Sequence, residues 1–233
     1  MTHPVLDAHA LSKKFTIHQL DKHITGCRHV SIRVDHGEFV GITGRSGSGK
    51  STVLKLIYRT YVPQTGSILY DSARFGRVDL ATADPRTVMY LRRHEIGYVS
   101  QFLHVVPRTT AREIVERATL EAGAGAGRAA RETERILSHF ELDRDLWDSY
   151  PNNFSGGEKL RLNIARAMVT HPRLLLLDEP TASLDARSKE RVRQLIEQLK
   201  DEGTTMLGIF HDIEVMSGLC DREYSMQNGH AAS

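Results

Sequence analysis

The sequence predicts an α/β fold with a mostly parallel core sheet, and three observations carry this prediction. Short apolar runs typical of strands alternate with stretches of helical apolar spacing. The four leucines at 174–177 are not interrupted by polar residues, as is typical of a parallel strand covered by helices on both faces. A glycine-rich turn at 44–49 joins one such strand to a helix. Together these features favour a doubly wound arrangement.

The expected elements follow in chain order. The strand Glu38–Thr43 precedes a helix at Ser51–Tyr58. Further strands are expected at Ser67–Tyr70, Ile96–Ser100 and Arg173–Leu177, with a last one at Thr204–Phe210.

Helical patterns occupy the stretch from Pro107 to Met168. Thr110 and Glu113 form a capping-box pattern, and 128–140 has helical periodicity. The tract Gly123–Gly127 offers no side chain to bury, so we expect it to link two helices.

Length, composition and charge limit the class of protein. The 233 residues, 40% of them hydrophobic, predict a single domain over 1–233, with a helical subdomain at about 102–168 inserted into its core. Lys plus Arg (31) against Asp plus Glu (29) leaves +2, too balanced to favour nucleic-acid binding. The two cysteines are far apart and the chain shows no leader or spanning run, so we expect a cytoplasmic protein that contacts a membrane only through an integral partner.

The turn after the first core strand matches the P-loop pattern G-x-x-x-x-G-K-[ST]. Its glycines let backbone amides surround phosphate oxygens, Lys50 supplies a charge to the β- and γ-phosphates, and Ser51 supplies a hydroxyl to Mg²⁺. The expected cofactors are therefore ATP and Mg²⁺. The predicted nucleotide-binding residues of this loop are Gly44, Arg45, Ser46, Gly47, Ser48, Gly49, Lys50, Ser51 and Thr52.

Two carboxylates follow the leucine-rich strand. Asp178 is expected to join the Mg²⁺ shell, and Glu179 to orient or deprotonate the attacking water. The alternative is that both merely cap the strand before a turn at Pro180. The P-loop favours the catalytic interpretation.

A second glycine-rich helix start follows Phe154. Ser155, Gly156, Gly157 and Glu158 begin a strongly helical stretch, so their backbone amides could bind an anion. A simple helix cap is the alternative.

These motifs, in this order, resemble the ATP-binding cassette (ABC) ATPases. The loop 44–51 matches Walker A, 154–158 the signature motif, 174–179 Walker B and 183–185 the D-loop. The resemblance implies an N-terminal antiparallel β region and an ATP site shared between two subunits, as a homodimer or with a related ATPase. Phe154 stands where the family usually has leucine, and Glu158 where it has glutamine.

The resemblance also implies roles for residues outside the P-loop. Gln101 is similar to the glutamine that touches Mg²⁺ or the water, and His211 to the switch histidine at the γ-phosphate. Asp185 belongs to the D-loop, and Ser155–Glu158 would meet the nucleotide of a second subunit. Phe15 is a candidate to stack on adenine, with a core position as the alternative.

The stretches 78–80, 99–108 and 208–212 resemble the PhnL-type ATPase subunits of the phosphonate carbon–phosphorus lyase system. That resemblance implies soluble lyase partners and support for converting alkylphosphonate plus ATP to ribose 1-phosphonate 5-triphosphate. The main alternative is the nucleotide-binding subunit of a lipoprotein-release or macrolide-export transporter. A scaffold that binds ATP without hydrolysing it is disfavoured by Glu179 and His211.

Overall fold

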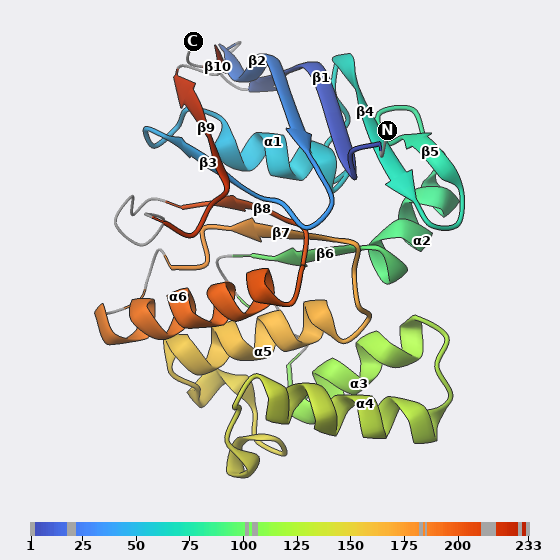
Figure 1. Cartoon of the computed structure of the whole chain (residues 1–233), viewed down its shortest axis with the longest axis vertical. Coiled ribbons are helices and arrows are strands. Elements are labelled where there is room, and N and C mark those ends of the chain that lie inside the picture. The colour runs from blue at the N-terminus through green and yellow to red at the C-terminus, as the bar shows by residue number, and fades with distance from the viewer. Residues whose placement is uncertain are drawn as a thin grey trace.

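The protein is arranged in layers around a six-stranded sheet, as the computed structural model shows (Figure 1). The structure describes residues 3–17, 22–100, 103, 107–181, 184, 186–210, 218–227 and 230–231. One helix and a second sheet lie on one face of the six-stranded sheet, and a layer of helices lies on the other (Figure 1). No helix within these residues is both long and apolar enough to span a bilayer.

The six-stranded sheet has the order β10-β9-β3-β8-β7-β6. All neighbouring pairs are parallel except β10 and β9, so the mostly parallel core sheet is confirmed. Its strands are β3 (Phe39–Gly44), β6 (Ile96–Val99), β7 (Leu174–Asp178), β8 (Met206–Ile209), β9 (Arg222–Gln227) and β10 (His230–Ala231).

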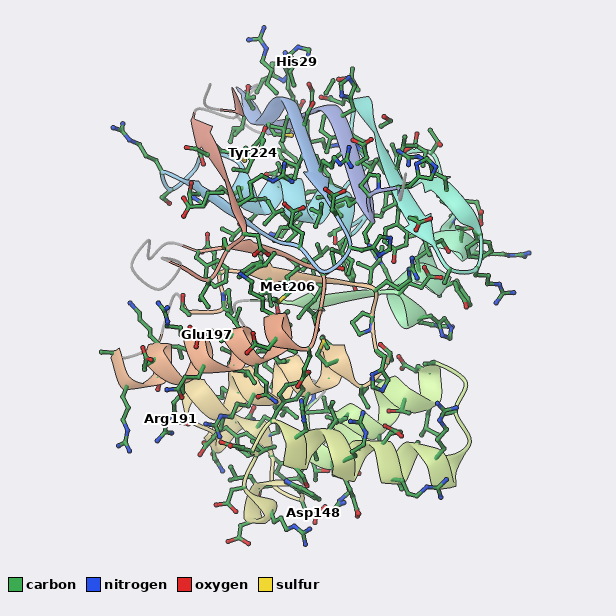
Figure 2. All side chains as sticks on the ribbon, in the orientation of Figure 1. His29, Asp148, Arg191, Glu197, Met206 and Tyr224 are labelled. Carbon is green, nitrogen blue, oxygen red and sulfur yellow. The ribbon has the colours of Figure 1, made fainter. Side chains whose placement is uncertain are left out.

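Successive residues of the core strands belong to two separate hydrophobic clusters, one on each face of the sheet. Leu175 and Leu177 pack with Met206 in a cluster that includes the helical layer, and Figure 2 shows Met206 between the sheet and that layer. Leu174 and Leu176 belong to the cluster on the opposite face. Because both faces of the sheet are covered, all four leucines of β7 are buried and no polar residue interrupts them.

The second sheet is antiparallel, with the order β2-β1-β4-β5. It confirms the expected N-terminal β region. Its strands are β1 (Leu6–Ile17), β2 (Lys22–Val34), β4 (Thr65–Ser72) and β5 (Gly76–Asp79). Helix α1 (Lys50–Ile57) lies between the two sheets, and α2 (Pro85–His94) leads from β5 to β6 (Figure 1).

The helical layer consists of α3 (Ala111–Glu121), α4 (Ala126–His139), α5 (Gly156–Met168) and α6 (Ala186–Asp201), with short 3-10 turns at Arg144–Leu146 and Pro151–Asn153. The capping box of Thr110 and Glu113 is present at the start of α3. The glycine–alanine tract links α3 to α4 only as far as Gly125, the N-cap, and its last two residues form the first turn of α4.

The expectation that Thr204–Phe210 forms the last strand is wrong, because β9 and β10 follow it. Strand β9 carries charged and polar residues, and within 222–226 only Met226 is fully buried, so these residues lack the apolar pattern of a core strand. Its backbone pairing with β3 places it in the sheet. Such pairing is set by tertiary contacts that local sequence does not report.

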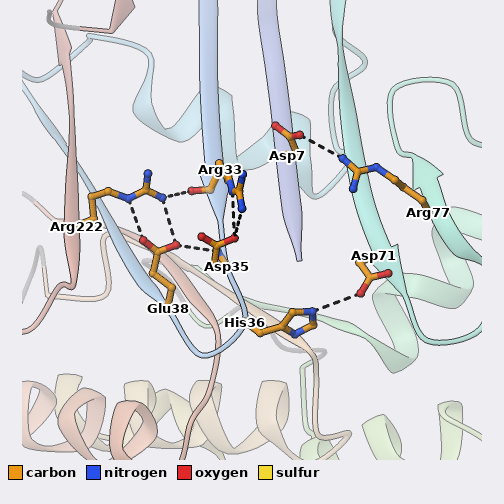
Figure 3. Close-up of polar contacts among 8 residues, drawn as sticks. All are labelled: Asp7, Arg33, Asp35, His36, Glu38, Asp71, Arg77 and Arg222. Atoms are coloured by element: carbon orange, nitrogen blue, oxygen red, sulfur yellow. Dashed lines mark hydrogen bonds and ion pairs between the residues drawn. The ribbon is translucent and has the colours of Figure 1, made fainter. Parts of the chain in front are cut away.

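Ion pairs and hydrogen bonds join β9 to the turn between β2 and β3 (Figure 3). Arg222 forms two hydrogen bonds with the Glu38 carboxylate, at 2.9 and 3.2 Å, and donates to the carbonyl oxygen of Arg33. Glu38 also accepts from the backbone amide of Asp35 at 2.7 Å. This network fixes the strand that flanks the P-loop strand.

Candidate nucleotide site

Backbone packing around the glycine-rich loop excludes side chains at two positions. Gly44 has φ +140° and Gly49 has φ +96°, in the left-handed region that favours glycine. A methyl group on Gly44 would lie 2.2 Å from the Met226 carbonyl oxygen, and one on Gly49 would lie 1.8 Å from the Gly26 carbonyl oxygen. The loop is therefore held between β9 and β2, with its backbone turned around the start of α1.

Lys50 is the first residue of α1 and is 4% exposed. Its ammonium donates to the carbonyl oxygens of Gly44 at 2.7 Å and Arg45 at 3.0 Å. Burial lowers the pKa of Lys50, and the nearby negative charge of Glu179 opposes that shift. Ser48 is buried beside it, and its hydroxyl has no hydrogen-bond partner among the described residues. The loop thus holds a buried cation and an unsatisfied polar atom.

Asp178 and Glu179 emerge at the carboxyl end of β7, where parallel sheets bind ligands. Asp178 is 8% exposed and accepts a hydrogen bond from the Tyr98 hydroxyl at 2.5 Å. Glu179 has φ +53°, unusual for a residue with a side chain, and its amide donates to the Ile209 carbonyl at 3.1 Å. Strained backbone of this kind persists where the surrounding structure enforces it, often at functional sites. The structure thus brings Glu179 within electrostatic reach of Lys50.

Ser155 caps α5 on the other side of the core sheet from α1 (Figure 1). Its hydroxyl accepts from the Glu158 amide at 3.3 Å, and the Glu158 carboxylate accepts from the Ser155 amide at 2.7 Å. This capping box occupies two of the amides that the sequence leaves available at the helix start. A methyl group on Gly156 would lie 2.5 Å from the Leu184 side chain, so this turn packs tightly against Leu184.

Phe15 lies half-buried on β1, close to the loop. Its ring meets Tyr61 edge-on at 5.0 Å between centroids, and the Lys13 ammonium lies 5.6 Å from its centre. A methyl group on Gly26 would lie 2.6 Å from the Phe15 ring and 2.9 Å from the Thr52 side chain. Phe15 is therefore an accessible aromatic ring beside the first turn of α1. The predicted residues Gln101, Asp185 and His211 lie outside the described residues.

Sequence reasoning missed Tyr98, which contacts Asp178 from β6. Burial raises the pKa of the Tyr98 phenol, and the hydrogen bond to Asp178 raises it further. The contact follows from the pairing of β6 with β7, in which Tyr98 lies opposite Leu176, two residues before Asp178. This pairing is not visible in the sequence.

A basic cavity beside Tyr98 was also missed. It has a volume of about 380 Å³ and lies between α2, β6, α3 and α5. Its charged lining residues are Arg92, Arg93, Arg117, Glu121 and Arg166.

The fold and the glycine-lined loop together define an ATP-binding cassette. Residues 27–182 match the family model described as "ABC transporter". The chain belongs to this family. It binds ATP with Mg²⁺ and hydrolyses ATP, as members of the family do.

Relatives with assigned roles cover nearly the whole chain. It is 33% identical to lipoprotein-releasing system ATP-binding protein LolD 2 of Chlorobium chlorochromatii, over 97% of this chain and 92% of that protein. It is 34% identical to the macrolide export ATP-binding/permease protein MacB of Wolinella succinogenes and 31% identical to methionine import ATP-binding protein MetN 1 of Listeria monocytogenes. These matches span 98% and 97% of this chain but only 34% and 64% of the relatives.

Solved structures agree with the fold. The ATP-binding cassette MJ0796, a dimer in a post-hydrolysis state bound to ADP and Pi, superposes with a TM-score of 0.87 at 28% identity. The match covers 98% of this chain and 97% of that one. A second dimeric structure of MJ0796, described as a bacterial ABC transporter cassette, gives the same TM-score at 30% identity.

Proposed function

We propose that this chain is the ATP-hydrolysing subunit of a membrane transporter of the lipoprotein-release or macrolide-export kind, working on the cytoplasmic side. The observation that carries this proposal is the glycine-lined loop with buried Lys50, whose ammonium senses the negative charge of Glu179, in a chain that is similar over 97% of its length to LolD 2. The phosphonate assignment receives no support from the relatives named above, which favour the transporter alternative.

The loop suits a nucleoside triphosphate. Methyl groups at Gly44 and Gly49 would fill the space between backbone segments, and the Ser48 hydroxyl is buried without a partner in the described part of the chain. We assign Lys50 to the β- and γ-phosphates and the amides of 44–52 to the phosphate oxygens. Phe15, beside Thr52, would stack on adenine.

The hydroxyl of Ser51 and the carboxylate of Asp178 would hold Mg²⁺, which neutralises charge on the phosphates. Glu179 would accept the proton of the attacking water, because Asp178 cannot serve the metal and the water equally well. Gln101 and His211 keep their predicted roles at the metal and the γ-phosphate, and Asp185 its place in the D-loop.

The complete site would need two copies. Ser155, Gly156, Gly157 and Glu158 lie at the start of α5, across the core sheet from α1 (Figure 1). One chain therefore cannot close its own signature turn over its own P-loop. The dimeric structures of MJ0796 support pairing of two cassettes.

The basic cavity between α2, β6, α3 and α5 is the surface we assign to the permease partner. Four arginines against one glutamate favour a partner segment that carries acidic residues. The surface lies on β6, directly before the segment that contains Gln101.

A soluble partner complex is the second candidate function. The stretches 78–80, 99–108 and 208–212 favour it, because they resemble the ATPase subunit of the phosphonate carbon–phosphorus lyase system. In that case the same cavity would receive a soluble lyase subunit, and the ATP site would be unchanged.

Purification of the tagged chain from its own cells separates the two candidates. Membranes solubilised in mild detergent and the soluble extract are processed separately, and bound proteins are identified by mass spectrometry. An integral permease in the membrane fraction supports the transporter. Lyase subunits in the soluble fraction, together with loss of growth on alkylphosphonate but not on phosphate when the chain is deleted, overturn it in favour of the second candidate.

A further inference from the structure

The hydroxyl of Tyr98 holds one oxygen of the Asp178 carboxylate. It donates to Oδ2 at 2.5 Å, within the range of charge-assisted O–H···O⁻ bonds, which are stronger than neutral ones. Tyr98 is on β6 and Asp178 ends β7, and the two strands are paired in parallel. The bond therefore bridges neighbouring strands at the edge where the proposed metal site lies.

One further side chain stacks on the Tyr98 ring, and a second contacts that stacking partner. Tyr58, directly after α1, stacks on it with 4.6 Å between centroids and 29° between planes. Arg92 of α2 lies over the Tyr58 ring, with its guanidinium carbon 4.4 Å from the ring centre. Arg92 also donates to the Tyr58 carbonyl oxygen at 2.7 Å. The Tyr98 ring is therefore restrained by Tyr58, which follows the P-loop helix and is itself held by Arg92 of α2.

We propose that Tyr98 is a positioning residue that orients Asp178 for Mg²⁺. It engages Oδ2 and restrains rotation of the carboxylate, which leaves the other oxygen for the metal shell. This inference rests on the proposed role of Asp178 at Mg²⁺. Groups that hydrogen-bond a metal-ligating carboxylate fix its direction, and their loss weakens metal binding.

The same rings connect the metal site to the basic cavity. Tyr58, Tyr98 and Arg92 all line that cavity, so a partner segment seated there would touch the rings that hold Asp178. A partner bound in the cavity would then influence the orientation of the Asp178 carboxylate through the Tyr98 hydroxyl, and the orientation of that carboxylate would in turn influence partner binding.

The test uses Tyr98→Phe, which keeps the stacked ring and removes only the hydroxyl. Binding of a fluorescent ATP analogue is titrated over a series of free Mg²⁺ concentrations and also in EDTA. The Mg²⁺ concentration at half-maximal enhancement of binding should rise roughly tenfold, the lower end of what loss of such a partner costs. Binding in EDTA should stay at the wild-type level.

Tyr70→Phe is the matched control, because Tyr70 is a buried tyrosine whose hydroxyl donates to the Glu95 carbonyl oxygen, away from the loop. Asp178→Asn tests the proposed function itself. A shift in Asp178→Asn without one in Tyr98→Phe overturns the role of Tyr98 alone. No shift in either overturns both assignments.

The double variant Tyr98→Phe, Asp178→Asn supplies a second test. If Tyr98 acts through Asp178, its substitution adds nothing to the Mg²⁺ dependence of Asp178→Asn. An additive effect overturns the proposal. Should Tyr98→Phe fail to fold, Tyr58→Leu is used instead. It keeps the hydroxyl of Tyr98 but removes the ring that stacks on Tyr98, and it should also raise the Mg²⁺ midpoint. An unchanged midpoint there overturns it.

Discussion

The backbone of Gly49 packs directly against the backbone of Gly26, so that a methyl group on Gly49 would lie 1.8 Å from the Gly26 carbonyl oxygen. Gly26 is on β2 of the antiparallel sheet and Gly49 is the N-cap of α1. This contact sets how closely the P-loop approaches the second sheet. It also makes the loop sensitive to the smallest possible side chain.

Gly49→Ala should therefore abolish nucleotide binding and destabilise the fold. The left-handed φ alone costs on the order of 1–2 kcal/mol, and the backbone clash adds to it. Gly203→Ala is the control, since Gly203 lies outside the loop and also has a left-handed φ, +77°, but nothing lies within 4 Å of an added methyl. Urea unfolding and nucleotide titration of both variants check this. Equal losses in the two would contradict the packing argument.

Glu179→Gln should leave ATP binding intact and slow hydrolysis by about 10²- to 10⁴-fold, the usual contribution of a general base. ATP would then accumulate between two copies, and sedimentation with ATP and Mg²⁺ should show a dimer. Glu197→Gln, on α6 in an ion pair with Arg193, is the control and should hydrolyse ATP normally. A variant at Glu179 that stays monomeric under these conditions speaks against the two-copy site.

Arg93→Glu should impair partner binding while ATP affinity stays unchanged. Arg93 is exposed on α2 and lines the basic cavity, so reversal of its charge would repel an acidic partner segment. Arg191→Glu reverses an exposed charge on α6 and should have no effect (Figure 2). Co-purification from membranes and nucleotide titration measure the two properties. Loss of ATP affinity at Arg93 would show that the cavity and the ATP site are not separate.

Removal of the Arg222 side chain should destabilise the protein by about 1 kcal/mol, because the pair with Glu38 is partly exposed. The effect should shrink as salt concentration rises, since salt screens exposed charges. Arg222→Ala and Glu38→Gln compared in a double-mutant cycle by urea unfolding measure the coupling. Additive losses would mean that the contact in Figure 3 contributes no coupling energy.

Alkaline pH should weaken the fold through Cys27. Burial raises the pKa of this thiol from 9.0 to about 11. Between these values the folded protein binds more protons than the unfolded chain, so the free energy of unfolding should be unaffected below pH 9 and fall as the pH rises toward 11. Urea unfolding of wild type and Cys27→Ala from pH 8 to 11 checks it. Cys27→Ala should lose stability less steeply, and parallel slopes would count against the role of this thiol.

The P-loop, the buried leucine strand and the capping box of Thr110 and Glu113 were predictable from sequence, because each depends on residues close together in the chain. Gly44–Ser51 specifies its own turn, and Ser155 with Glu158 specifies its own helix start. Helix boundaries at α4 differed by a few residues, since glycine and alanine are compatible with both a linker and a first helical turn.

Sequence alone thus determined the fold class and the ATP chemistry, since both are encoded in short motifs with fixed spacing, and it predicted the residues that carry this chemistry. Tertiary structure alone decided that β9 completes the core sheet, that Gly26 lies under Gly49, and that Tyr98 holds Asp178. Each of these contacts joins segments 23 or more residues apart, and which strands become neighbours depends on the packing of the whole core. No local pattern reports such a pairing before the chain has folded.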